Sequence, residues 1–184
     1  MGRIDKHMEF ISGFSKQGGK VRDLNRIKSL LKAVGNPEKS LKFVHIAGTN
    51  GKGSMAQMFS EIFIDAGYKT GLFTSPYIIE YNDRIQINGQ NISDEEIEII
   101  SNEIRPIVES LEGDTDFSQF EITQTIAFLY FAKMQCDIVV LETGVGGLLD
   151  STNVIEAPLV SVIGSVSYDH TAVLGNTLEE IAFQ

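Results

Sequence analysis

A glycine-rich run between a short apolar segment and a helical pattern carries the clearest chemistry in the sequence. The run GTNGKGS occupies positions 48–54, directly after KFVHIA at 42–47. Glycines at such a place let backbone N–H groups approach phosphate oxygens closely, and the start of the following helix adds partial positive charge. Lys52 would add a mobile cation, and the hydroxyl of Thr49 or Ser54 could reach a phosphate or Mg²⁺. The run therefore predicts a phosphate-binding loop.

This loop departs from the common phosphate-loop pattern. The position five before Gly51 is Ile46 instead of glycine, and Gly53 follows Lys52 where serine or threonine is usual. The alternative interpretation is a glycine-rich turn that binds no ligand. The lysine disfavours that alternative, because its side chain has little packing value in such a turn.

Other polar residues follow apolar runs elsewhere in the sequence. Glu142 ends the run DIVVLE, where an unpaired carboxylate is costly to bury, so a bound ion or a basic side chain is expected beside it. Ser75 precedes a proline and could equally shape a turn. His170 could equally be an ordinary surface histidine. His45, inside its apolar run, is interpreted as structural.

The spacing of apolar residues predicts alternating helices and strands around these positions. Helical spacing occurs at 23–34, 55–67, 93–110 and 119–134, and a last helix opens within 176–184. Strand-like runs occur at 42–47, 69–75, 137–142 and 159–164. Asn88-Gly89 predicts a hairpin turn within 84–92. An acidic stretch at 112–118 is expected to be a mobile loop.

The alternation predicts an α/β fold with a doubly wound, mostly parallel sheet. The runs at 137–142 and 159–164 are almost entirely apolar, which is typical of parallel strands covered on both faces. The helix after the glycine-rich loop has an apolar stripe expected in the core, formed by Met55, Met58, Phe59 and Ile62. Ligands of such sheets lie beyond the carboxyl ends of the strands, which is where the loop and the polar residues above fall.

Composition narrows the classes of partner. The 184 residues carry a formal net charge of −10, which argues against a general nucleic-acid or anionic-membrane surface. The single cysteine forms no internal disulfide, and no apolar run is long enough for a membrane span or signal peptide. The sequence therefore predicts a cytoplasmic protein that binds neither nucleic acid nor membrane.

Four segments, in order, carry a resemblance to a known family. They are HIAGTNGKGS at 45–54, FTSPYIIEYNDRIQING at 73–89, VVLETGVGGLLDSTNVI at 139–155 and DHTAVLGNTLEEIA at 169–182. Together they resemble the folylpolyglutamate synthases and dihydrofolate synthases, within the larger family of Mur-type ligases. The fold implied is part of the central domain of a Mur ligase, with a P-loop-type turn that binds ATP.

The resemblance implies an ATP-dependent ligase that adds L-glutamate to a folate or dihydropteroate carboxylate through an acyl phosphate. Lys52, Glu142 and His170 would be catalytic, and Ser75, Glu142 and His170 would hold Mg²⁺. The nucleotide would be bound by Gly48, Thr49, Asn50, Gly51, Lys52, Gly53, Ser54 and Asn153. The folate-type substrate would meet Tyr77, Tyr81, Arg84, Phe120 and Glu121, although core packing is the alternative for the aromatic residues. Many relatives carry a basic residue where this chain has Leu148, so an anion contact there is in doubt.

The same resemblance implies that residues 1–184 are the N-terminal part of the ATP-binding domain of a longer protein. The carboxy-terminal domain that binds glutamate would be absent from this chain, and the chain alone would be inactive. We expect a monomer. Two alternatives stay open: a Mur-type ligase for a peptidoglycan precursor, and a nucleotide-binding module without ligase activity. A P-loop kinase or GTPase is disfavoured, because the longer glycine spacing and an Asn-Lys-x-Asp segment are missing.

Overall fold

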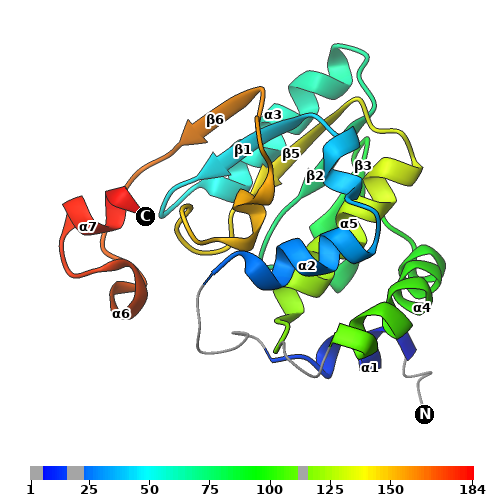
Figure 1. The fold of residues 1–184 in the computed structure, drawn as a ribbon. Coiled ribbons are helices and arrows are strands. Elements are labelled where there is room, and N and C mark those ends of the chain that lie inside the picture. Colours follow the sequence, from blue (N-terminus) through cyan, green and yellow to red (C-terminus); the bar gives the residue numbers. More distant parts are fainter. Residues whose placement is uncertain (1–5, 16–22, 112–115) are drawn as a thin grey trace.

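The computed structural model describes residues 6–15, 23–111 and 116–184 and contains one six-stranded sheet with helices on both faces (Figure 1). The sheet order is β4-β3-β2-β5-β1-β6. The strands are β1 (Phe43–Ala47), β2 (Thr70–Phe73), β3 (Ile85–Ile87), β4 (Gln90–Asn91), β5 (Ile138–Glu142) and β6 (Val160–Ile163). The helices are α1 (Lys6–Ser12), α2 (Asn25–Ala33), α3 (Lys52–Asp65), α4 (Asp94–Leu111), α5 (Gln119–Lys133), α6 (Thr171–Leu174) and α7 (Leu178–Phe183).

Strands β2, β5, β1 and β6 are parallel, and β3 and β4 continue the sheet as an antiparallel hairpin. Asn88 and Gly89 between them both have positive φ, as a type I′ turn requires. The predicted doubly wound, mostly parallel α/β sheet is thus confirmed. In the register, Ile46 lies opposite Glu142, so the end of β1 and the end of β5 meet at one edge of the sheet.

The central strands send alternate side chains to two separate apolar layers, as the period of two in a strand requires. Val139 and Leu141 of β5 pack with α2, α4 and α5 in the larger cluster. Ile138 and Val140 pack with α3 in the smaller one. Figure 1 shows α2 and α5 on one side of the sheet and α3 on the other. The sheet is therefore held from both faces where the central strands lie.

Helix α5 is buried almost all round, as its apolar sequence predicts. Ser118 begins it: the Ser118 hydroxyl accepts the Glu121 N–H, and the Glu121 carboxylate accepts the Ser118 N–H. This capping box satisfies donors that the first turn leaves free. Most of the stretch at 112–118, expected to be a mobile loop, lies outside the described residues. Residues 116–118 are described and lead into this cap.

Two expectations about burial are wrong. Strand β6 is expected to be covered on both faces, but within the described residues it pairs with β1 alone, and 73% of Ile163 is exposed. In α3, Met58 and Ile62 are exposed by 64% and 61%, because the helix turns the small residues Ala56 and Ser60 to the sheet. Met55 and Phe59 do pack against the smaller apolar cluster, as expected.

Candidate functional site

The glycine-rich loop lies between β1 and α3, as the sequence predicts. Gly48 and Gly51 have φ values of 139° and 78°, which side chains rarely adopt. A Cβ at Gly48 would lie 3.1 Å from the backbone of Gly164, at the end of β6. The loop can therefore follow this path only with glycine at position 48.

Thr49 fastens the loop to the segment after β6. Its N–H donates to the Ser165 carbonyl at 2.7 Å, and its hydroxyl donates to the Ser167 carbonyl and accepts the Ser167 N–H. The hydroxyl that the sequence suggested for phosphate or Mg²⁺ is thus engaged with Ser167. Thr49 nevertheless lines the cavity described below.

Lys52 opens α3 and folds back over the loop. Its Nζ donates to the carbonyls of Gly48 at 2.9 Å and Thr49 at 3.3 Å. The ammonium group and the free N–H groups of the first turn of α3 place positive charge at one point. This arrangement suits an anionic ligand.

Glu142 lies beside this loop, at the end of β5. The residue is only 3% exposed, and its Oε2 accepts the Ser75 N–H at 3.0 Å. Gly53 in the first turn of α3 faces it, since a Cβ there would lie 3.5 Å from Oε2. The structure therefore brings Ser75, Glu142 and the loop together.

The pKa of Glu142 is raised, chiefly because burial disfavours the charged form. The Ser75 N–H and the charge of Lys52 oppose this shift, whereas the nearby Asp150 carboxylate adds to it. Two buried carboxylates with one lysine nearby would be stabilised by a further cation. The hydroxyl of Thr143, the next residue along the chain, is buried without a hydrogen-bond partner.

These features fit Mg²⁺ bound together with a nucleotide. Magnesium is held in such sites by one or two carboxylate or hydroxyl oxygens, with substrate phosphates and water completing its shell. Within the described parts of the chain, no group of three or more His, Cys, Asp or Glu side chains is arranged to hold a metal alone. Glu142 with Ser75 would therefore hold the ion only with the help of phosphate oxygens.

A cavity of about 340 Å³ opens beside the loop. Among the predicted site residues, those that line it are Gly48, Thr49, Lys52, Asn153 and His170. Asn50, Gly51, Gly53, Ser54, Ser75 and Glu142 are not among the residues that line it. The cavity thus gathers about half of the predicted nucleotide and metal residues at the carboxyl edge of the sheet.

His170 is the N-cap of α6 and has the left-handed conformation, with φ of 47°. Its Nε2 lies 3.8 Å from Asp169 Oδ2, and both side chains are about half exposed. His170 lines the same cavity as Lys52. Its predicted place at the nucleotide site is compatible with the structure, and its role as a metal ligand stays a prediction.

Three of the predicted substrate residues form one cluster. The Arg84 guanidinium lies 5.2 Å from the ring centroid of Tyr77 and 5.5 Å from that of Tyr81. Arg84 Nε is buried without a hydrogen-bond partner. The Tyr81 hydroxyl is bonded to Thr123 at 2.6 Å, and burial raises the pKa of Tyr81 to about 12. The cluster offers a cation between two aromatic rings.

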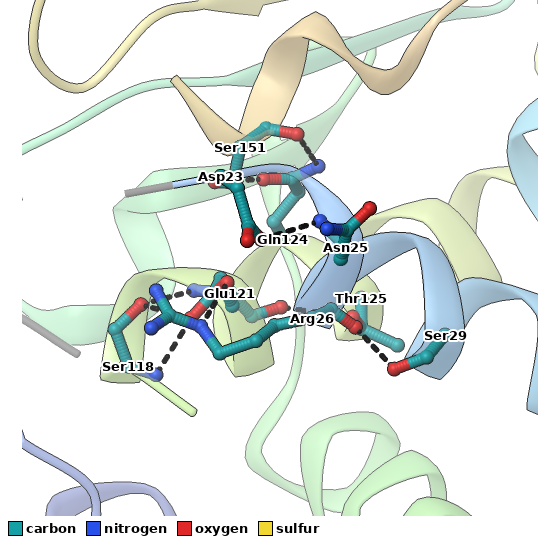
Figure 2. A network of polar contacts seen from close by, with 9 residues as sticks. All are labelled: Asp23, Asn25, Arg26, Ser29, Ser118, Glu121, Gln124, Thr125 and Ser151. Carbon is teal, nitrogen blue, oxygen red and sulfur yellow. Dashed lines mark hydrogen bonds and ion pairs between the residues drawn. The ribbon is translucent and has the colours of Figure 1, made fainter. Parts of the chain in front are cut away.

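Phe120 and Glu121, the other two predicted substrate residues, lie at the start of α5. The Phe120 ring packs on Phe73, and a Cβ at Gly144 would lie 3.1 Å from it. The Glu121 carboxylate binds Arg26 Nε at 3.3 Å and the N–H and hydroxyl of Ser118 at 2.8 Å (Figure 2). Phe120 therefore borders the loop after β5, whereas Glu121 is occupied within the protein. Its substrate role stays a prediction.

Sequence reasoning missed several residues of the cavity. Leu174 and the segment 181–184 line it from α6 and α7, and the carbonyl of Gln184 accepts the N–H groups of Gly147 and Leu148. His45 also lines it. Its Nε2 is 2.8 Å from the Thr152 hydroxyl, and it is buried as the structural interpretation expected. The apolar pattern of α7 gave no sign that this helix borders a site.

Comparison with known proteins decides the family. The chain matches no protein-family model. It is 50% identical over 163 residues to the dihydrofolate synthase/folylpolyglutamate synthase of Bacillus subtilis, which is 86% of this chain and 37% of that protein. It is 39% identical over 166 residues to the folylpolyglutamate synthase of Lacticaseibacillus casei, which is 89% of this chain and 39% of that one.

The fold agrees over nearly the whole chain. A solved FPGS–AMPPCP–folate complex matches with a TM-score of 0.90 and 37% identity, over 96% of this chain and 43% of that one. The chain belongs to the folylpolyglutamate synthase and dihydrofolate synthase family. The resemblance drawn from the four segments is thereby confirmed.

The chain spans well under half the length of the family members it matches. The fold shared with them includes β1, the glycine-rich loop and β5, which carry the site described above. Among the described residues, no helix combines the length and apolar character needed to cross a membrane.

Proposed function

We propose that this chain supplies the ATP-binding part of a ligase that adds L-glutamate to a reduced folate or to dihydropteroate. Residues 1–184 would be the N-terminal part of the ATP-binding domain, and the domain that binds glutamate would lie in the remainder of a longer protein. The solved complex with AMPPCP and folate supports both ligand classes. The B. subtilis relative, named for both activities, supports both carboxylate substrates.

The observation that carries the proposal is the meeting of two groups at one edge of the sheet. Lys52 and the start of α3 bring positive charge to the loop, and Glu142 beside Ser75 brings a buried carboxylate to the same place. Phosphoryl transfer needs neutralisation and positioning of the phosphates more than it needs a protein nucleophile. This arrangement provides both without a covalent step on the protein.

The reaction would run in two steps. A carboxylate oxygen of the folate or dihydropteroate attacks the γ-phosphorus of ATP, and ADP leaves. The amino group of L-glutamate then attacks the acyl phosphate, and phosphate leaves as the amide bond forms. Lys52 and the loop amides would hold the phosphates, with Asn153 and His170 at the same cavity. Magnesium, when bound at Glu142 and Ser75, would supply charge neutralisation on the phosphates.

The cluster of Tyr77, Tyr81 and Arg84 would bind the folate-type substrate. The Arg84 guanidinium is a planar cation that can donate to a carboxylate, and the rings offer flat surfaces for an aromatic substrate. Phe120 would add a further ring. The enzyme would act as a cytoplasmic monomer on small molecules, and its single cysteine fits a reducing compartment.

The experiment is a substrate competition with the complete protein. Purified enzyme is given ATP, Mg²⁺ and labelled L-glutamate with tetrahydrofolate, dihydropteroate or a peptidoglycan-precursor carboxylate, and products are identified by mass spectrometry. We expect a product one glutamyl residue heavier from a folate substrate. A Lys52→Ala variant should lose at least about 100-fold in kcat/KM for ATP, the range seen when one charge-stabilising donor is removed.

Two results would overturn the proposal. One is glutamylation of the peptidoglycan precursor alone, which would assign the chain to a Mur-type ligase. The other is release of ADP with no amide product from any of the carboxylates, which would leave a nucleotide-binding module. We expect the 184-residue chain alone to bind Mg-nucleotide weakly and to form no amide.

A further inference from the structure

The consecutive residues Asp150, Ser151 and Thr152, in the turn after β5, each bind a different part of the fold. Asp150 Oδ2 accepts the N–H groups of Gly144 at 3.0 Å and Val145 at 2.9 Å. Ser151 exchanges two hydrogen bonds with Gln124 of α5 (Figure 2). Thr152 is bonded to His45 in the middle of β1. The segment 150–152 therefore joins the loop after β5, helix α5 and strand β1.

Thr152 links His45 to Asp150 by two hydrogen bonds, and the direction of each bond follows from the chemistry of the three groups. Asp150 is buried and receives four donors, because Oδ1 also accepts the N–H and the hydroxyl of Thr152. Four donors fill the acceptor sites of an ionised carboxylate. The Thr152 hydroxyl thus gives its proton to Asp150 and must accept a proton from His45. The ring of His45 carries its N–H on Nε2.

His45 is neutral while it makes this bond. Burial lowers the pKa of His45 to about 4, so the ring is uncharged near neutral pH. A fixed chain of donors then leads from His45 Nε2 through the Thr152 hydroxyl to Asp150, and from the amides of Gly144 and Val145 to the same carboxylate. We call the side chains of His45, Thr152 and Asp150 the His45 relay.

The relay connects the two strands that carry the site. Strand β1 leads into the glycine-rich loop at 48–54. Gly144 and Val145 come two and three residues after Glu142, which ends β5. His45, Gly144, Val145 and Lys52 all line the same cavity. One residue, Thr143, separates Glu142 from the amides that Asp150 holds.

We propose that His45 is a positioning residue for the nucleotide site: through Thr152 it orients Asp150, which holds the turn at Gly144 and Val145 so that Glu142 faces the phosphate loop. This assignment rests on the proposed function for its catalytic consequence. A buried imidazole and a buried carboxylate cost free energy that an apolar pair of the same shape would not. In this protein the buried imidazole and carboxylate fix the geometry of the turn after β5.

The test uses variants of the complete enzyme. His45→Leu and Thr152→Val break the relay, whereas His45→Gln keeps an N–H donor and Thr152→Ser keeps the hydroxyl. Thr125→Val is the matched control, because Thr125 is buried and its hydroxyl donates to the Glu121 carbonyl of its own helix. Each variant is measured for thermal stability, for kcat and KM with ATP, and for hydrogen exchange of the Gly144 and Val145 amides.

We expect His45→Leu and Thr152→Val to lower kcat/KM for ATP by about tenfold or more, equivalent to about 1.4 kcal/mol of transition-state stabilisation. The amides of Gly144 and Val145 should exchange about tenfold faster or more, because their acceptor loses its orientation. The Gln and Ser variants should stay within about threefold of the wild type for both quantities. The double variant His45→Leu/Thr152→Val should be no worse than the more damaged single variant.

Unchanged exchange at Gly144 and Val145 in both disruptive variants would overturn the proposal. So would an equal loss of kcat/KM in Thr125→Val at equal loss of stability, since the role of His45 would then be structural only. If His45→Leu does not fold, Thr152→Val and Thr152→Ser decide the question. Amide exchange needs no folate, so a wild-type enzyme that forms no glutamyl product would refute the proposed function and leave this test intact.

Discussion

At the scale of single residues, the site is defined by charges that are buried close to one another. Burial raises the pKa of both Glu142 and Asp150, and the charge of Asp150 adds to the shift at Glu142. Lys52 is the cation that opposes this effect at Glu142. A cation bound beside Glu142 would therefore lower the electrostatic cost of burying its charge.

Glu142→Gln should make the ligand-free protein more stable and the enzyme inactive. A carboxyl group whose pKa is raised by folding destabilises the folded state once pH exceeds its unfolded pKa of about 4.5. The excess stability of the variant should thus be near zero at pH 4, grow as pH rises through the folded pKa, and be full above it. Turnover should fall at least about 100-fold through loss of the charged ligand.

Thermal unfolding of both proteins between pH 4 and pH 8, in chelator, measures the stability effect. Glu98→Gln, at an exposed position of α4, is the control and should show no such divergence. A variant less stable than the wild type at pH 8 would contradict the assignment of Glu142 as a carboxylate that folding disfavours.

At the scale of elements, helix α5 joins the two halves of the candidate site. It begins at the Ser118–Glu121 capping box, where Arg26 of α2 donates to the Glu121 carboxylate (Figure 2). About one turn later, the Gln124 amide donates to the Ser151 carbonyl. Phe120 in its first turn borders Gly144. This helix therefore contacts both the turn at 150–152 and the loop after β5.

Ser118→Ala should destabilise the protein by about 1–2 kcal/mol, because it removes the acceptor for the Glu121 N–H at the start of α5. Denaturant unfolding followed by circular dichroism measures the change. The control is Ser110→Ala on the exposed surface of α4, where a loss of about 0.5 kcal/mol or less is expected. Equal losses of unfolding free energy in the two variants would contradict a stabilising role of the Ser118 cap.

At the scale of the whole molecule, the two faces of the sheet are covered unequally. The larger apolar cluster lies under α1, α2, α4 and α5, whereas on the other face α3 supplies the helical cover of the smaller cluster. Met58 and Ile62 on the outer side of α3 and Ile163 on the edge strand are exposed. The stability of this chain should therefore depend on the inner side of α3 and very little on its outer side.

Replacing both Met58 and Ile62 by Gln should change the free energy of unfolding of the 184-residue chain by about 0.5 kcal/mol or less per site. Leu72→Ala, in the buried layer beneath α3, should cost about 2–5 kcal/mol. Equilibrium unfolding in urea measures both. A large loss in the double Gln variant would mean that the outer side of α3 is packed after all.

The sequence alone determined the features that depend on local chemistry. The glycine-rich loop between β1 and α3, the Asn88-Gly89 turn and the caps of α4, α5 and α7 all follow from residues within a few positions of one another. The order of the four segments also identified the family. These features need no knowledge of distant contacts, because hydrogen bonds and φ preferences within one turn decide them.

Only the tertiary structure decided which face of each element is buried and which polar groups meet. The sequence of β6 resembles that of β5 in its apolar run, yet among the described residues β6 lies at one end of the sheet order, and its residues are more exposed. Ser75 and Glu142 are far apart in sequence, and the parallel pairing of β2 with β5 brings them together. His45 and Thr152 are likewise distant in sequence, and they meet where the turn at 150–154 packs against β1. Such contacts depend on strand order and register, and one apolar run is compatible with several of each.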